Sequence, residues 1–259
     1  MLPQRKKRKA KPLNKTTDGL VIKEVNIGEA DRMITVLTKD EGIITAYASG
    51  VKSIKSKRGG ATGLLAYSDF SFTSKGNTLR VKEASPINLF FGKSSDIEIL
   101  AIEQYFCELA LAFGESASDG KEFLRLILNS LYYLTENKKN PYLIKAITEM
   151  RICTISGYCP DLVACSECGK YEDDIMYFNI ADGSLVCNGC GNSGININRT
   201  LLSALRHIVY SDFSGIYSFR IPDNDAQILS EITEEYLNYR IDKKFKTLEF
   251  LKELKRGTY

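Results

Sequence analysis

The chain has 259 residues, of which 44% are hydrophobic and 26% are charged, and its formal net charge is +3. This composition excludes a wholly disordered chain and allows one large or two modest hydrophobic cores. Glutamates interrupt the longest apolar run, residues 97–113, so the sequence also excludes a membrane-spanning helix, which needs roughly 20 apolar residues.

The net charge hides a strong asymmetry along the chain. Residues 1–15 hold 7 Lys and Arg and no acid, whereas residues 92–239 hold 11 basic against 21 acidic residues. Such segregation suits a protein whose N-terminal part meets a polyanion while its middle meets other proteins. We expect residues 1–15 to form a disordered basic extension. No apolar signal core follows them, so we expect a cytoplasmic protein.

Short β-type segments alternate with glycine-containing turns over residues 16–91. The pattern predicts five strands, at Leu20–Val25, Met33–Thr38, Ile43–Ala48, Tyr67–Thr73 and Leu79–Ala84. A unit of this size favours a small closed barrel of the OB-fold type, although an open five-stranded sheet would show the same pattern.

A basic loop follows the third expected strand. No acidic residue lies between Glu41 and Asp69, and four cations cluster in this interval: Lys52, Lys55, Lys57 and Arg58. Cations on a loop at a barrel rim can neutralise nucleic-acid phosphates, which gives sequence-independent affinity that falls with salt. The alternative is a solvated turn without a ligand.

Four aromatic residues lie close to this loop in the expected barrel: Tyr47, Tyr67, Phe70 and Phe72. Outward-facing rings would stack on bases, as in barrels that bind single strands. Strand alternation turns about half of them into the core, and the sequence leaves open which half.

The hydrophobic period becomes helical after Pro86. We expect five amphipathic helices, at 95–114, 121–136, 141–156, 200–211 and 223–241, with Ser95 and Glu98 forming a capping box at the first. They predict one bundle over residues 92–259, interrupted by a small module at 160–195. The fold class is therefore α+β, with a barrel followed by a helical domain.

Two Cys-x-x-Cys-Gly motifs form the sharpest local signal, and they supply Cys165, Cys168, Cys187 and Cys190. Two such pairs predict one structural Zn²⁺ per chain, because four thiolates complete a tetrahedral site and leave no position open for water. Glycine after each second cysteine allows a turn through positive φ. A redox dithiol is the alternative, but it normally uses one such pair. We expect Cys107, Cys153 and Cys159 to be small core residues.

Enzyme motifs are missing from the sequence. With one histidine, His207, and no nucleophile elbow, phosphate loop or paired-carboxylate motif, the sequence indicates a protein that is not an enzyme.

Several segments together resemble the bacterial RecO family of recombination and repair proteins. In the N-terminal part these are 17–23, 28–32, 38–42 and 50–60. Downstream, Glu149–Arg151 and Ser156–Leu162 run into Cys165-x-x-Cys168-Gly169, and Tyr236–Arg240 precedes Lys243–Lys246 and Leu248. The resemblance covers about residues 16–254, and the order of the segments is more specific than any one of them. The family usually begins near Thr16, so residues 1–15 inherit no role.

The resemblance implies an OB-fold, a helical domain and a zinc module. It also implies binding of single- and double-stranded DNA, annealing of complementary strands, and cooperation with RecR in loading RecA onto DNA coated by single-stranded-DNA-binding protein. The zinc role falls on the four cysteines above, and the DNA role on Lys52, Lys55, Lys57 and Arg58, with Arg32 as a weaker candidate.

The same resemblance implies a pocket in the helical domain for the acidic, apolar tail of the single-strand-binding protein. Arg125 or Arg151 could meet the carboxylates of that tail, although either could be an ordinary helix-surface charge. Two other classes of protein stay open. One is a zinc-ribbon adaptor that binds only protein, and the other is a redox enzyme that uses the cysteine pairs.

Overall fold

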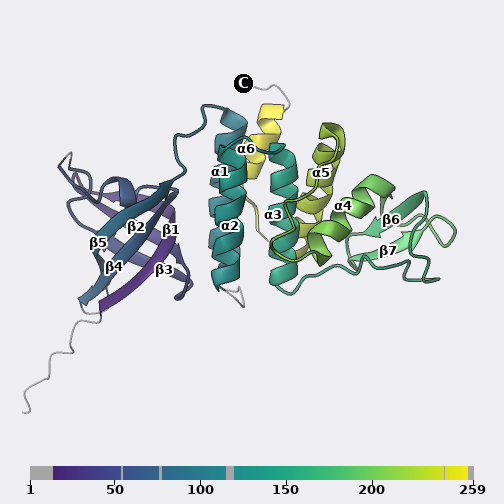
Figure 1. Ribbon diagram of the computed structural model, residues 1–259, viewed down its shortest axis with the longest axis horizontal. Coiled ribbons are helices and arrows are strands. Elements are labelled where there is room, and N and C mark those ends of the chain that lie inside the picture. The colour runs from purple at the N-terminus through teal and green to yellow at the C-terminus, as the bar shows by residue number, and fades with distance from the viewer. Residues whose placement is uncertain (1–13, 54, 76–77, 115–119, 242, 256–259) are drawn as a thin grey trace, which may run out of the picture. The chain divides into compact units, whose positions relative to one another are not determined.

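The computed structural model of the chain describes residues 14–53, 55–75, 78–114, 120–241 and 243–255 (Figure 1). The chain divides into two compact units, Met1–Phe91 and Gly92–Tyr259. Most of the expected basic extension, residues 1–13, lies outside the described residues, and its last two residues, Asn14 and Lys15, belong to the first strand. Within the described ranges, no helix has the length and apolar character needed to cross a membrane.

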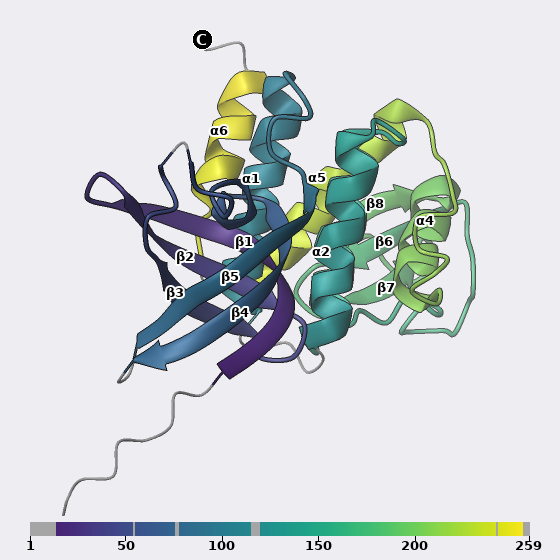
Figure 2. The ribbon, with the colours of Figure 1, turned by 60° about the vertical axis from the view of Figure 1, so that its left-hand side comes forward.

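The first unit is a closed five-stranded barrel, drawn in purple to blue in Figure 2. Its strands are β1 (Asn14–Ile27), β2 (Asp31–Thr38), β3 (Ile43–Ala48), β4 (Ala66–Lys75) and β5 (Thr78–Leu89). The hydrogen-bonded order is β1-β2-β3-β5-β4, and β1 closes the barrel by pairing with β4. A register shift between Val21 and Lys23 lies where β1 passes from β4 to β2. The predicted barrel is confirmed, and the open sheet is wrong.

Strand alternation decides which aromatic residues enter the barrel core. Phe70 and Phe72, two residues apart on β4, are at most 1% exposed, and their ring centroids lie 5.3 Å apart. Tyr47 and Tyr67 are half-buried instead, and their hydroxyls donate hydrogen bonds to carboxylates of the barrel surface. The two phenylalanines are therefore core residues and are not accessible to bases.

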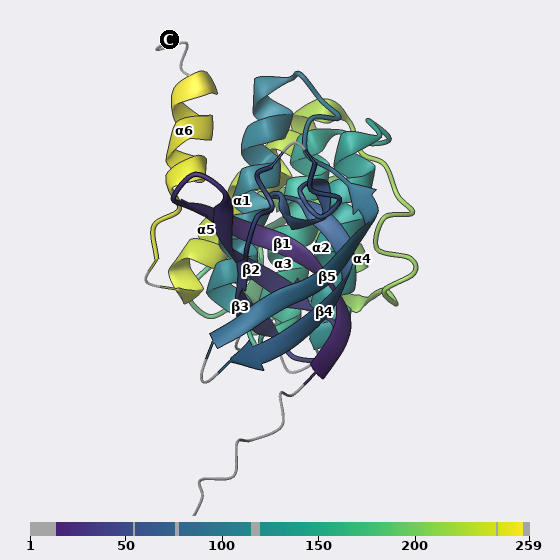
Figure 3. The same cartoon turned by 90° about the vertical axis from the view of Figure 1, so that its left-hand side faces the viewer.

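Helices dominate the second unit. They are α1 (Ile97–Phe113), α2 (Gly120–Thr135), α3 (Pro141–Ile155), α4 (Arg199–Tyr210), α5 (Asp223–Arg240) and α6 (Lys246–Lys255). Five of them were predicted, whereas α6, which packs beside α1 in Figure 3, was not. The expected capping box at α1 is wrong: the side chain of Asp96, not Ser95, accepts the hydrogen bond from the backbone N–H of Glu98, at 2.8 Å.

A small sheet lies between α3 and α4, in the segment where the sequence predicts a module. Its strands, β6 (Ile175–Asn179), β7 (Ser184–Cys187) and β8 (Ile195–Asn198), pair in the order β7-β6-β8. The ring of Phe178 packs against Tyr236 of α5 at 5.4 Å, and Arg240 donates hydrogen bonds to two backbone carbonyls of the module. These contacts attach the module to the helices.

A charged network occupies the interior of the helical unit. Lys145 is 3% exposed and pairs with the fully buried Glu149 at 2.8 Å and with Glu234 of α5 at 2.9 Å. The hydroxyls of Tyr105 and Thr233 donate to Glu149 at 2.8 and 2.7 Å. Burial alone would lower the pKa of Lys145, but the two carboxylates outweigh it and raise that pKa. The lysine therefore stays charged and compensated.

Glu103 of α1 is a different case, because it is buried and its two oxygens have no hydrogen-bond partner among the described residues. Burial raises its pKa from 4.5 to about 7. Between these values the folded state keeps a proton that the unfolded state has lost. The free energy of unfolding should therefore fall as the pH rises from about 4.5 to about 7, by at most about 3 kcal/mol from this group.

The Glu103→Gln variant tests this expectation, because glutamine has nearly the same shape and no charge. Urea unfolding of both proteins at pH 5 and pH 8 should show the variant gaining stability relative to the parent at the higher pH. Glu136→Gln, at an exposed position, is the control and should follow the parent. Parallel pH profiles for the parent and the Glu103 variant would refute the prediction.

Candidate metal centre and nucleic-acid interface

The four predicted metal ligands converge at one end of the small sheet. Cys165 and Cys168 lie in the loop before β6, Cys187 ends β7 and Cys190 follows it. Their Sγ atoms all lie within 4.8 Å of one another, and those of Cys168 and Cys187 are 3.7 Å apart. Sulfurs on a tetrahedron with metal–sulfur bonds of about 2.3 Å lie about 3.8 Å apart. The cluster could therefore hold a metal ion.

The backbone around the cluster turns differently at the two knuckles. Gly169 has a φ of 73°, and its N–H donates to the carbonyl of Cys165 at 2.9 Å. Gly191 makes the matching bond to Cys187 at 3.2 Å without a positive φ, so the expectation for this second glycine is wrong. The N–H of Cys187 points at Sγ of Cys165, at 3.3 Å, as donors to metal-bound sulfur do.

The other three cysteines lie outside the cluster. Cys107 and Cys153 are buried as expected, and burial raises the pKa of both thiols, which keeps them protonated. Cys159 is exposed, so the expectation of a core position is wrong for this residue. It follows the end of α3, where the chain leaves the helical core for the module.

Three lysines of the basic loop present exposed side chains after β3: Lys52, Lys55 and Lys57. The ammonium of Lys52 donates to the carbonyl of Gly28 at 3.3 Å. The ammonium groups of Lys55 and Lys57 have no hydrogen-bond or ion-pair partner among the residues that the structure describes. Their charge is accordingly available to a ligand.

The two arginines assigned to DNA hold the loop on the barrel. Arg58 donates to the carbonyls of Val81 on β5 and of Ser49, both at 2.9 Å. Arg32 donates to the carbonyl of Gly59 at 3.2 Å and lies 3.5 Å from a carboxylate oxygen of Glu24. Both guanidinium groups thus position the loop that carries the lysines.

Asp31, the first residue of β2, fixes the start of the loop. Its carboxylate accepts hydrogen bonds from the hydroxyl of Tyr47 and, at 2.7 Å, from the backbone N–H of Gly50. These two bonds, the one from Tyr47 foremost, lower the pKa of Asp31. The carboxylate stays ionised, and the loop is anchored at this end as well.

The structure gives Arg125 and Arg151 different surroundings. Arg125 is exposed on α2, with its guanidinium carbon 4.3 Å from the ring centroid of Phe213. Arg151 is only 7% exposed, and its guanidinium donates to carbonyls at the end of α4, at 3.3 to 3.4 Å, and to Glu122 at 3.4 Å. Arg151 therefore links α3 to α4 and α2.

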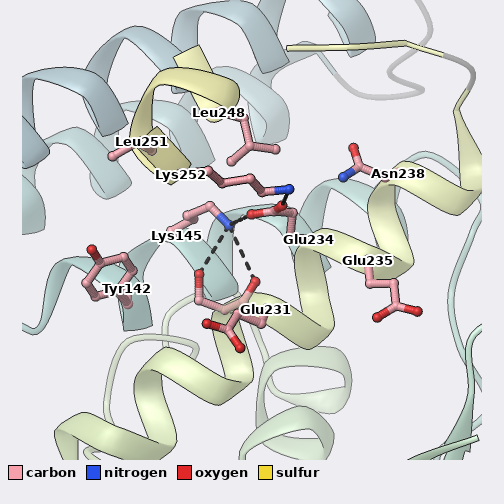
Figure 4. Close-up of a pocket in the computed structure, with 10 residues that line it drawn as sticks. Tyr142, Lys145, Glu231, Glu234, Glu235, Asn238, Leu248, Leu251 and Lys252 are labelled. Atoms are coloured by element: carbon pink, nitrogen blue, oxygen red, sulfur yellow. Dashed lines mark hydrogen bonds and ion pairs between the residues drawn. The ribbon is translucent and has the colours of Figure 1, made fainter. Parts of the chain in front are cut away.

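A cavity of about 530 Å³ opens between α3, α5 and α6 (Figure 4). Figure 4 shows Lys145 and Lys252 both pointing at Glu234, with ion pairs of 2.9 and 2.6 Å. Glu231 and Glu235 add further carboxylates to the wall. Neither Arg125 nor Arg151 lines this cavity, and its acidic wall does not complement an acidic peptide.

The fold and the sites define a class of protein: an OB-type barrel with a cationic loop, joined to a helical unit whose four-cysteine module could hold a metal. Comparison of the sequence with known protein families agrees with this class. A family model described as "Recombination protein O N terminal" matches residues 13–90, and one described as "Recombination protein O C terminal" matches residues 94–249.

Relatives match over nearly the whole chain. "DNA repair protein RecO" of Acetivibrio thermocellus is 32% identical over 243 residues, which is 93% of this chain and 97% of that protein. The protein of the same name from Dehalococcoides mccartyi is 30% identical over 95% of this chain and 98% of its own length. The chain belongs to the RecO family of DNA repair proteins.

Proposed function

We propose that this chain is a recombination mediator that binds single- and double-stranded DNA, anneals complementary strands and, with RecR, helps to load RecA onto DNA coated by single-stranded-DNA-binding protein. Membership of the RecO family supports this function. The observation that carries the DNA role is the set of exposed lysines on a loop that arginines hold against an OB-type barrel. No acidic residue lies between Glu41 and Asp69 in the sequence, so the loop itself contributes only positive charge.

In this mechanism the lysines neutralise phosphates of one strand and release its counterions. The repulsion between that strand and an approaching complementary strand becomes weaker, and annealing becomes faster. The contacts are made to the backbone, so we expect little dependence on base sequence.

We further propose that the cysteine cluster holds one Zn²⁺ per chain, with Cys165, Cys168, Cys187 and Cys190 as ligands. Four sulfurs with the two-residue spacing of each pair are typical of structural zinc. When bound, the zinc ion would cross-link the two cysteine pairs of the module. A complete set of four protein ligands leaves no open position, which supports a role in folding and not in catalysis.

The acidic tail of the single-strand-binding protein remains the proposed ligand of Arg125 and Arg151. Exposure favours Arg125 as the direct contact, because Arg151 already donates to several carbonyls within the helical unit. Arg151 would then act by holding α2 and α4 in place.

The double variant Lys55→Gln/Lys57→Gln tests the DNA role while leaving Arg58 and Arg32 to hold the loop. We expect this variant to bind a fluorescent single strand more weakly than the parent does. The slope of log K against the logarithm of the salt concentration should be shallower than the parent's by about 1.4, because two phosphate contacts are lost. The measurement is fluorescence anisotropy across a salt series.

Lys23→Gln/Lys39→Gln is the matched control, because both lysines are exposed on the same barrel and lie outside the loop. This control should retain more of the parent's affinity and slope. Equal behaviour of the two double variants would remove the loop as the contact. A parent protein that binds no DNA would favour the alternative of a zinc-ribbon adaptor.

A further inference from the structure

Two neighbouring cavities open where helices of the second unit begin. The starts of α3 and α5 lie together, since the side-chain amide of Asn140, the N-cap of α3, donates to Asp223 of α5 at 2.7 Å. One cavity of about 450 Å³ lies here, and another of about 470 Å³ lies toward the start of α4. Arg220 and Ile221 line both, so the two cavities adjoin at these residues, and we treat them together as one groove.

Four cations line this groove, and we call it the cation groove: Lys138, Lys139, Arg199 and Arg220. They are four of only 11 basic residues in 92–239, where acidic residues number 21. Their gathering on one face of an otherwise acidic segment indicates a ligand of negative charge.

Three of these cations form no ion pair with any described residue: Lys138, Lys139 and Arg220. The ammonium of Lys138 donates to the hydroxyl of Tyr132 and lies 4.1 Å from the centroid of that ring. The ammonium of Lys139 donates to the carbonyl of Phe219 at 2.8 Å. Burial and the like charge of Arg220 lower the pKa of Lys139. An anion placed between these side chains would relieve their mutual repulsion.

The carboxylates that line the groove do not cancel this charge. Asp223 is held by the amide of Asn140, at 2.7 Å. Arg199 pairs with two carboxylates, Glu172 at 3.4 Å and Asp174 at 2.9 Å. The charge of Arg199 is therefore offset, and the positive charge of the groove rests on Lys138, Lys139 and Arg220 against Asp223.

The shape of the groove favours a strand over a compact anion. The cations are spread along two adjoining cavities, which suits the repeated phosphates of a nucleic-acid backbone. Thr200 and Ser203 add hydroxyl donors, and the rings of Phe219 and His207, 4.7 Å apart, offer apolar faces for bases. An acidic peptide would pair with the cations, but it has no bases to stack on the two rings.

We propose that the cation groove binds the phosphodiester backbone of a second nucleic-acid strand. This inference rests on the proposed function, in which the barrel loop holds the first strand. With separate sites for two strands, one protein molecule brings complementary strands together instead of waiting for their collision.

A bridging assay with two non-complementary strands tests the proposal. The full-length protein is loaded on an immobilised oligothymidine, and capture of a fluorescent oligothymidine is then measured. The groove variant Lys138→Glu/Arg220→Glu should stay on the immobilised strand but capture at least about ten-fold less of the second strand. Lys243→Glu/Lys244→Glu makes the same charge change at exposed positions outside the groove and should capture within about two-fold of the parent.

Each other outcome overturns the proposal in a distinct way. Unchanged capture by the groove variant would mean that barrel loops hold both strands, for example the two loops of a dimer. Equal losses in both variants would reflect net charge alone. If the groove variant instead loses binding of a fluorescent oligoglutamate while strand capture persists, the groove serves an acidic protein. A parent protein that is not retained on the immobilised strand refutes the proposed function itself. Unchanged thermal unfolding midpoints confirm that both variants fold.

Discussion

The Cys165→Ser variant is expected to lose stoichiometric zinc and the ordered structure of the module over residues 160–198, while the barrel stays folded. Three remaining sulfurs cannot complete the tetrahedral site, and the module has only three short strands to hold it together. Structural zinc contributes an apparent 10–16 kcal/mol, roughly, to the folding of small zinc-finger peptides, so its loss should have a large effect. Elemental analysis and amide hydrogen exchange measure the two consequences.

Cys159→Ser is the matched control, because this cysteine is exposed, lies six positions earlier and is outside the cluster. It should keep one zinc per chain and the exchange protection of the parent. Metal-free parent protein with an ordered module, or a fully loaded Cys165→Ser variant, would contradict the assignment. Rapid reaction of all four thiols in metal-free protein would point to the redox alternative.

The Lys145→Met variant should lose about 3–5 kcal/mol of unfolding free energy. Methionine fills most of the space of the lysine side chain but leaves Glu149 fully buried without its counter-charge. Urea unfolding at pH 7 measures the loss. Addition of Glu149→Gln to the same variant should recover much of it, because glutamine removes the buried charge and its side-chain oxygen can still accept a hydrogen bond from the hydroxyl of Tyr105 or Thr233.

Lys252→Met provides the comparison for this network. Lys252 pairs with the same Glu234, but its side chain is 53% exposed, so we expect a loss of about 0–1 kcal/mol. Similar losses for the two lysines would show that burial does not govern the network.

The barrel follows from the sequence more completely than the helical unit. A period of two places Phe70 and Phe72 on one face of β4, and the turn residues divide the five strands. The polar start of β1, Asn14–Gly19, escaped prediction because its pairing with β4 leaves no apolar pattern in the sequence. Helix α6 escaped because it has 10 residues and a short apolar face around Leu248 and Leu251.

Sequence spacing also predicts some site residues and not others. The paired cysteine motifs predict a four-sulfur cluster, because the two cysteines of each pair are close in sequence and the fold only has to bring the two pairs together. The role of Arg58 in holding the loop was not predicted, because its bond to the carbonyl of Val81 connects residues 23 positions apart, which no local pattern encodes. Its contact with DNA stays a prediction. The same limit applies to the cation groove, where Lys138 and Arg220 line one cavity only because α3 and α5 pack together.

Strand annealing tests the central claim most directly. Complementary strands, bare or coated with single-stranded-DNA-binding protein, are mixed with the parent protein or with Lys55→Gln/Lys57→Gln, and duplex formation is followed by fluorescence. The account predicts faster annealing of both substrates by the parent and a clear loss of that acceleration in the loop variant. Annealing that the parent does not accelerate, or that the loop variant accelerates equally, would contradict it.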